Sequence, residues 1–284
     1  MPDLRLAALM MGSLLAITGC ATDDAQKTQS TAVTPFGHVH GIGLNPGDDR
    51  LYVASHNGVF RLDDGTSTLV AGRAQDTMGF TIASADRFLA SGHPAIGSDD
   101  PNPLGLISST DRADTWDPVS LGAEADLHAI DTTEKLIYAY GSSGTIIRSD
   151  DDGQTWDVIA PGEFIDIAAD PTSPDQLLAT TPTGVLLTIG PDAEPDEVTE
   201  APPMVFVDRT SDGRVVGLDP NGSVFVGSTD AADWEERSSL GSRPEALSVR
   251  SDTWFAATDS GLFQSRDEGA TWDKILIQDV DGQS

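Results

Sequence analysis

Cysteine is nearly absent from this sequence of 284 residues, which contains Cys20 and no other. A single cysteine cannot form an internal disulfide. Basic residues are scarce as well, because 16 Lys and Arg stand against 46 Asp and Glu, giving a formal net charge of -30. A surface with this charge repels nucleic acid and anionic lipid head groups, so nucleic acid is excluded as a partner.

The N-terminal apolar run, residues 6–17, is too short for a transmembrane helix and has the layout of a secretion signal. It ends in ITGC at residues 17–20, which resembles the lipobox of bacterial lipoproteins. That resemblance implies cleavage before Cys20 and attachment of lipid to it. We therefore expect a signal peptide over 1–19, with lipidated Cys20 and a flexible tether over 20–35. The protein would then be exported and anchored to the cell membrane, touching it through the lipid only.

Tryptophan-containing segments repeat along the rest of the chain. Residues 149–156 and 265–272 share the pattern S-x-D-x-G-x-T-W, residues 109–116 lack its glycine, and residues 228–234 are one residue shorter. The tryptophans that end these four segments are 40, 78 and 38 residues apart, so one copy in the middle gap has lost its tryptophan. These segments resemble Asp-boxes, also called BNR repeats, which are structural turns. The expected turn residues are Asp111, Trp116, Asp151, Gly153, Trp156, Asp230, Trp234, Asp267, Gly269 and Trp272.

A period of about 39 residues is typical of one four-stranded propeller blade. Short apolar runs occur once per period, at residues 51–54, 88–90, 137–140, 177–179, 215–217 and 254–256. We therefore predict an all-β fold, a six-bladed β-propeller, as a single domain over 36–279 with a C-terminal tail at 280–284. The expected blades cover residues 36–72, 73–121, 122–161, 162–201, 202–240 and 241–279.

The histidines gather in the first half of the chain. In a blade whose strands run outward, the start of the first strand and the loop after the second share one rim, while the Asp-box turns lie on the other. All five histidines occupy the first kind of position, on blades 1 to 3, and Met78 begins the first strand of blade 2.

Any one of these histidines could simply cap a loop, but histidine is also the commonest metal ligand. A thioether would favour copper and a carboxylate zinc or iron. The candidate ligands for a transition metal, copper or zinc, or for a small ligand held by it, are His38, His40, His56, His93, His128 and Met78.

Four further segments resemble a bacterial lipoprotein family that is labelled glycosylhydrolase or sialidase-like. They are HVHG at 38–41, LYVASHNGVF at 51–60, GHP at 92–94 and EADLH at 124–128. The resemblance implies a glycoside hydrolase with a glycan partner. The chain has only three tyrosines and no Arg-Ile-Pro segment, so the usual sialidase residues are missing. A noncanonical site would use paired carboxylates, and the candidates are Glu124, Asp126, Asp166 and Asp208. A third alternative is an assembly-factor propeller that binds a membrane protein, because Asp-boxes identify architecture and not activity.

Overall fold

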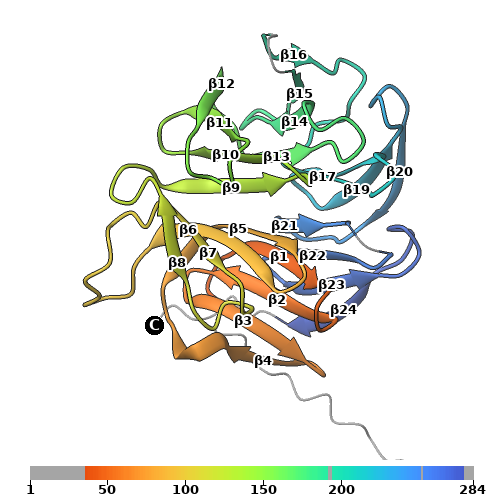
Figure 1. Ribbon diagram of the computed structural model, residues 1–284. Coiled ribbons are helices and arrows are strands. Elements are labelled where there is room, and N and C mark those ends of the chain that lie inside the picture. The colour runs from red at the N-terminus through yellow and green to blue at the C-terminus, as the bar shows by residue number, and fades with distance from the viewer. Residues whose placement is uncertain (1–35, 191–193, 251, 278–284) are drawn as a thin grey trace, which may run out of the picture. The chain divides into compact units, whose positions relative to one another are not determined.

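The computed structural model describes residues 36–190, 194–250 and 252–277, which form six four-stranded antiparallel sheets in a ring (Figure 1). This confirms the six-bladed, all-β propeller. Among the described residues, no helix is long and apolar enough to cross a membrane. The expected signal peptide, Cys20, the tether and the C-terminal tail at 280–284 lie outside the described residues.

Each blade consists of four strands that are consecutive in sequence and pair in chain order. Blade 1 contains β1 (Val39–Asn45), β2 (Arg50–Ser55), β3 (Gly58–Asp63) and β4 (Thr66–Leu69). Blade 2 contains β5 (Asp76–Ser84), β6 (Arg87–His93), β7 (Leu106–Ser109) and β8 (Asp117–Ser120). Blade 3 contains β9 (Leu127–Thr132), β10 (Ile137–Gly141), β11 (Thr145–Ser149) and β12 (Asp157–Pro161). Blade 4 contains β13 (Asp166–Ala169), β14 (Leu177–Thr180), β15 (Leu186–Ile189) and β16 (Asp196–Glu197). Blade 5 contains β17 (Phe206–Arg209), β18 (Val215–Leu218), β19 (Ser223–Gly227) and β20 (Trp234–Ser239). Blade 6 contains β21 (Pro244–Ser248), β22 (Trp254–Thr258), β23 (Gly261–Ser265) and β24 (Asp273–Ile277).

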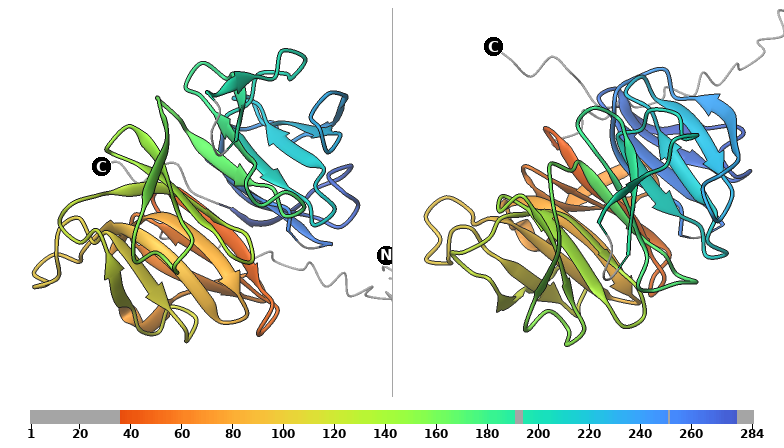
Figure 2. Two further views of the ribbon diagram at one scale, coloured as in Figure 1. Left: turned by 45° about the horizontal axis from the view of Figure 1, so that its top comes forward. Right: turned by 90° about the horizontal axis from the view of Figure 1, so that it is seen from above.

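The blades follow one another around the ring (Figure 2). The core lies between the blades, and the second strands β2, β6, β10, β14, β18 and β22 supply much of it. In β2, Leu51 and Val53 pack against blade 6, whereas Tyr52 and Ala54 pack against blade 2. Alternate side chains of a strand point to opposite faces, and here both faces are covered. That is why these strands appear in the sequence as continuous apolar runs.

The tryptophan-containing segments form turns between the third and fourth strands. In the turn at 149–156, Asp151 Oδ1 accepts hydrogen bonds from Ser149 Oγ (2.8 Å) and Thr155 N (2.9 Å). The Thr155 hydrogen bonds lower the pKa of Asp151 to about 2. Trp156 Nε1 donates to Ser120 Oγ of the preceding blade at 3.0 Å. These side chains are thus committed to the turn and to the contact between blades. The same serine–aspartate pairing occurs in the other three copies, at Ser109, Ser228 and Ser265.

Candidate functional site

Four of the six innermost strands carry a β-bulge at the same position, and the bulges bring chemically active side chains to one rim. In β1, Val39 pairs with Ser55 and Gly41 with Ala54, so His40 is the extra residue. Bulges bend a strand and redirect a side chain, and they are common beside active sites. The extra residues are His40 in β1, Met78 in β5, His128 in β9 and Glu245 in β21.

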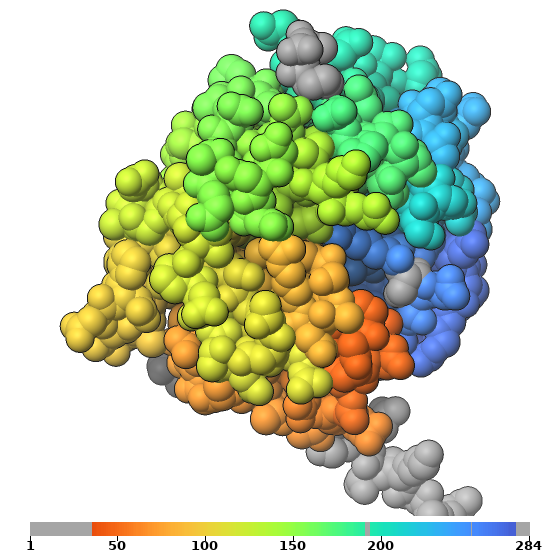
Figure 3. Space-filling view, in the orientation of Figure 1, coloured from red at the N-terminus to blue at the C-terminus, as the bar shows by residue number. Residues whose placement is uncertain are grey.

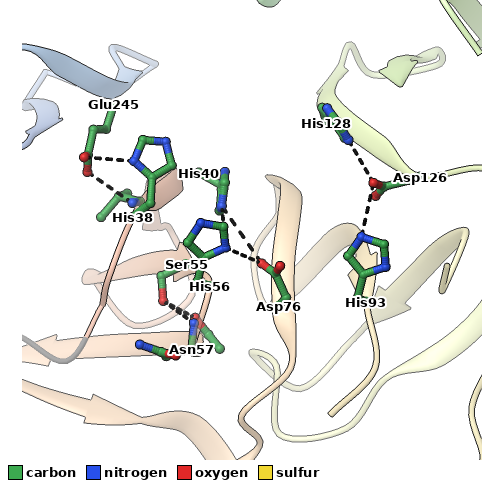
Figure 4. Close-up of polar contacts among 12 residues, drawn as sticks. His38, His40, Ser55, His56, Asn57, Asp76, His93, Asp126, His128 and Glu245 are labelled. Atoms are coloured by element: carbon green, nitrogen blue, oxygen red, sulfur yellow. Dashed lines mark hydrogen bonds and ion pairs between the residues drawn. The ribbon is translucent and has the colours of Figure 1, made fainter. Parts of the chain in front are cut away.

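His40, His56 and Asp76 converge from three segments of blades 1 and 2 (Figure 4). His40 Nε2 lies 3.3 Å from His56 Nδ1 and 4.0 Å from Asp76 Oδ1. His56 Nδ1 lies 3.0 Å from Asp76 Oδ1. One ligand atom of each residue lies within 4.8 Å of the others, so the group could hold a metal ion. We call these three residues the first cluster.

Local hydrogen bonds position His56 just beyond β2. Ser55 Oγ donates to the carbonyl of Gly58 (3.0 Å) and accepts from Asn57 N (3.2 Å), which closes a tight turn. The amide of His56 donates to the carbonyl of His38 at 3.2 Å. The turn therefore directs the half-exposed imidazole of His56 toward the first strand.

His38 lies beside the first cluster but has a partner of its own. Its Nδ1 is 2.9 Å from Glu245 Oε1, while Glu245 Oε2 accepts from Val39 N at 3.1 Å. The buried Glu245 thereby ties blade 6 to blade 1. The rings of His38 and His40 meet edge to face, with centroids 4.8 Å apart. The bulge at His40, rather than regular strand alternation, is what sets this arrangement.

His93, Asp126 and His128 form a second cluster on blades 2 and 3 (Figure 4). Asp126 Oδ2 lies 2.8 Å from His128 Nε2 and 3.4 Å from His93 Nε2. His93 Nδ1 is 2.7 Å from Asn102 Oδ1, which belongs to the long loop after β6. In Figure 3 this loop projects as a yellow lobe at the edge of the molecule.

Burial and neighbouring charge set the protonation of the two clusters. Burial, followed by the charges of His38, His56 and His128, lowers the pKa of His40 to about 3. His40 is therefore a neutral imidazole at neutral pH, the form that binds metals. The hydrogen bond that His128 Nε2 donates to Asp126 raises the pKa of His128. Burial opposes the ionisation of Asp126, but the hydrogen bond and charge of His128 outweigh it and lower the carboxyl pKa.

The four carboxylate candidates do not form one group. Glu124 is exposed in the turn before β9, and among the described residues its side chain makes no hydrogen bond or ion pair. Asp126 belongs to the second cluster. Asp166 and Asp208 instead line the central channel, a cavity of about 420 Å³. Burial raises the pKa of Asp166 to about 7 and that of Asp208 to about 6.

The channel carboxylates also hold neighbouring blades together. Asp166 Oδ2 accepts from Val207 N at 3.0 Å, and Asp208 Oδ2 accepts from Val249 N at 2.9 Å. Each hydrogen bond links a carboxylate to the backbone in or just after the first strand of the next blade. Arg250 reaches into the channel and forms an ion pair with Asp131 of blade 3. These contacts give Asp166 and Asp208 a structural role beside any chemical one.

The structure thus brings all five predicted histidines to one rim, distributed between two clusters and Glu245. Met78 occupies a bulge on the same rim, but within the described part of the chain its sulfur makes no hydrogen bond to either cluster. Sequence reasoning missed Asp76 as a potential ligand. Asp76 precedes the bulge of β5 by two residues, as Asp126 precedes that of β9, so aligning the repeats could have identified it.

No protein-family model matches this chain, and no curated protein matches it either. Solved propellers do match. YCF48 bound to a D1 peptide is 17% identical over 88% of this chain and 84% of that chain, with a TM-score of 0.53. A GH74 enzyme from Niastella koreensis is 14% identical over 86% of this chain and 46% of that chain, with a TM-score of 0.61. A gluconolactonase from Xanthomonas campestris is 11% identical over 78% of this chain and 84% of that chain, with a TM-score of 0.61. At these identities the likeness shows the fold alone.

Proposed function

We propose that this protein binds a transition metal ion, zinc in preference to copper, through His40, His56 and Asp76. The supporting observation is the convergence of three ligand atoms from three segments. Two imidazoles and a carboxylate form a donor set that suits zinc, and no thiolate or thioether is needed. Copper remains the alternative if Met78 contributes its sulfur.

The separations of these atoms suit a tetrahedral ion. Zinc binds nitrogen and oxygen at about 2.0–2.1 Å, which places two ligands of a tetrahedron about 3.3 Å apart. In the structure these separations are 3.3, 3.0 and 4.0 Å. An ion could therefore enter with side-chain shifts of less than about 1 Å. Three protein ligands leave one coordination position for water or a small ligand.

The test is zinc binding to the purified full chain. Elemental analysis after loading and dialysis should find bound zinc, and calorimetric titration should give its affinity. His56→Ala and Asp76→Asn should weaken binding at this site by at least 10-fold. Asp117→Asn, an exposed carboxylate beside the turn on the opposite rim, is the matched control and should change nothing. Absence of bound zinc or copper under saturating conditions would contradict the proposal.

An acid–base hydrolase is the second candidate, and it is favoured by the raised pKa values of Asp166 and Asp208 in the channel. Carboxyl groups that keep a proton near neutral pH can serve as general acids. Turnover of a glycoside panel that Asp166→Asn abolishes without loss of metal would support this candidate. The peptide bound to YCF48 suggests a protein partner instead. Crosslinking at the membrane, without metal or turnover, would favour that alternative.

We propose that the protein is exported and acts outside the cytoplasm, anchored to the cell membrane by lipid on Cys20. The support is the lipobox-like sequence at 17–20 and the apolar run before it.

A further inference from the structure

We propose that His93, Asp126 and His128 form a second metal site, one blade further around the rim than the first. It rests on the proposed function only in the choice of zinc as the probe. Three independent features support this site: the repeat, the orientation of His93, and the burial of Asp126.

The strand registers relate the two clusters by one step of the propeller. Ser55 opposes Val39 in blade 1, and Gly92 opposes Thr77 in blade 2. His56 and His93, which follow Ser55 and Gly92, are therefore equivalent positions. By the same comparison Asp76 in β5 is equivalent to Asp126 before β9, because each precedes its bulge by two residues.

Both clusters thus contain a histidine from the loop after the second strand and a carboxylate from the next blade. The third residue of each cluster comes from a different position. In the first cluster it is the bulge residue of the same blade as the loop histidine, His40. In the second, the equivalent bulge residue is Met78, and His128 from the bulge of the next blade supplies the second imidazole. Both clusters therefore contain two histidines and one aspartate.

The orientation of His93 favours a cation at the second cluster. Asn102 Oδ1, an acceptor, lies 2.7 Å from His93 Nδ1, so Nδ1 carries the proton and donates it. In the neutral ring, Nε2 then presents a lone pair, and this nitrogen faces Asp126 Oδ2 at 3.4 Å. Either a second ring proton or a bound cation can lie between these two atoms, and a cation would coordinate both of them. Metal-binding histidines commonly have their other ring nitrogen held by such an acceptor.

Asp126 is positioned as a ligand and is incompletely paired. Its side chain is 14% exposed, and Oδ1 is buried with no hydrogen-bond partner among the described residues. Its backbone is fixed as well, since Ser142 N donates to the Asp126 carbonyl at 2.9 Å. Buried carboxylate oxygens without a partner are uncommon and call for an explanation such as a bound ion. A zinc ion coordinated by Asp126 and both histidines would provide such a partner. The nitrogen atoms of the two histidines lie farther apart than the ligand atoms of the first cluster, so the side chains would have to close around the ion.

The experiment measures zinc stoichiometry of the full chain and of four isosteric variants. The wild type should retain two zinc ions after loading and dialysis. Asp126→Asn and Asp76→Asn should each retain one, and the double variant should retain none. Asp117→Asn should keep both. Circular dichroism melting of each protein shows whether a loss of zinc reflects a loss of fold.

Asn102→Ala provides a second measurement that leaves all three ligands in place. Removing the acceptor from His93 Nδ1 should weaken only the second site, by about 10- to 100-fold. Cobalt substitution should show the loss as one of two visible absorption components. Suppose that the wild type binds one zinc ion, which Asp126→Asn retains and Asp76→Asn loses. That result would overturn this inference and leave the proposed function standing. One zinc ion lost only with Asp126→Asn would overturn the proposed function instead, and no zinc at all would overturn both.

Discussion

Gly92→Ala should damage the first cluster without touching any of its side chains. Gly92 has a φ of +143°, a conformation that L-residues rarely adopt. A Cβ at this position would overlap the carbonyl oxygen of Asp76 and approach Met78 N to 2.9 Å. Both contacts are with backbone, which cannot rotate away as a side chain can. Either β5 or β6 must therefore move, and Asp76 moves with β5.

A glycine in the loop that follows β6 provides the control. Gly97 also has a positive φ, +85°, but a Cβ there would meet nothing within 4 Å. Gly97→Ala should therefore cost about 1 kcal/mol, the price of the backbone conformation alone. Gly92→Ala adds the displacement of a paired strand, for a total of roughly 3–4 kcal/mol. For a domain of this size, that corresponds to a fall in Tm of about 6–15 °C.

Circular dichroism melting without metal, followed by zinc titration against a competing chelator, measures both effects. We expect zinc affinity at the first cluster to fall at least 10-fold in Gly92→Ala and to stay unchanged in Gly97→Ala. If both variants melt together and bind zinc like the wild type, the close approach of Gly92 does not position Asp76, and the reasoning is refuted.

Three further predictions concern the channel, the turns and the anchor. Folded protein should keep a proton on Asp166 up to about pH 7, whereas an unfolded chain releases it above about pH 4. This group therefore reduces the free energy of unfolding as pH rises through that window. Denaturant unfolding at several pH values should show that Asp166→Asn gains stability relative to the wild type between pH 4 and 7, by at most about 4 kcal/mol, and a pH-independent difference would count against it. Trp156→Phe should lose the hydrogen bond to Ser120 and about 1 kcal/mol of unfolding free energy, with zinc binding intact; an unchanged melting curve would show that this bond contributes nothing. Cys20→Ser should abolish incorporation of labelled fatty acid and release the protein from the membrane fraction, and continued labelling would disprove lipidation at Cys20.

Much of the fold could be predicted because a propeller blade is local in sequence. Each blade consists of four consecutive strands, so turn residues and apolar runs such as 51–54 and 137–140 indicate it directly. The placement of His56 and His93 on one rim followed from the same count of strands. Packing on both faces of each second strand removed the alternation of polar and apolar residues, but the period of the repeat compensated for it.

The composition of the two clusters could be predicted only in part. His40 and His128 were expected at the starts of first strands, but no local sequence pattern indicated that both are bulge residues. A bulge depends on the register between paired strands, and it redirects the side chain of the extra residue. Asp76 was missed for a related reason, since it becomes a neighbour of His40 and His56 only when blade 2 packs against blade 1.

The sequence by itself determined the number of blades, the rim that bears the tryptophan-containing turns, and the rim that bears the histidines. These features follow from strand order within each repeat. Tertiary structure decided which residues meet. It paired His38 with Glu245 beside the first cluster, and it placed Asp166 and Asp208 in the channel while leaving Asp126 at the rim. It also set the raised pKa values of the channel carboxylates, because burial exists only once the ring encloses them.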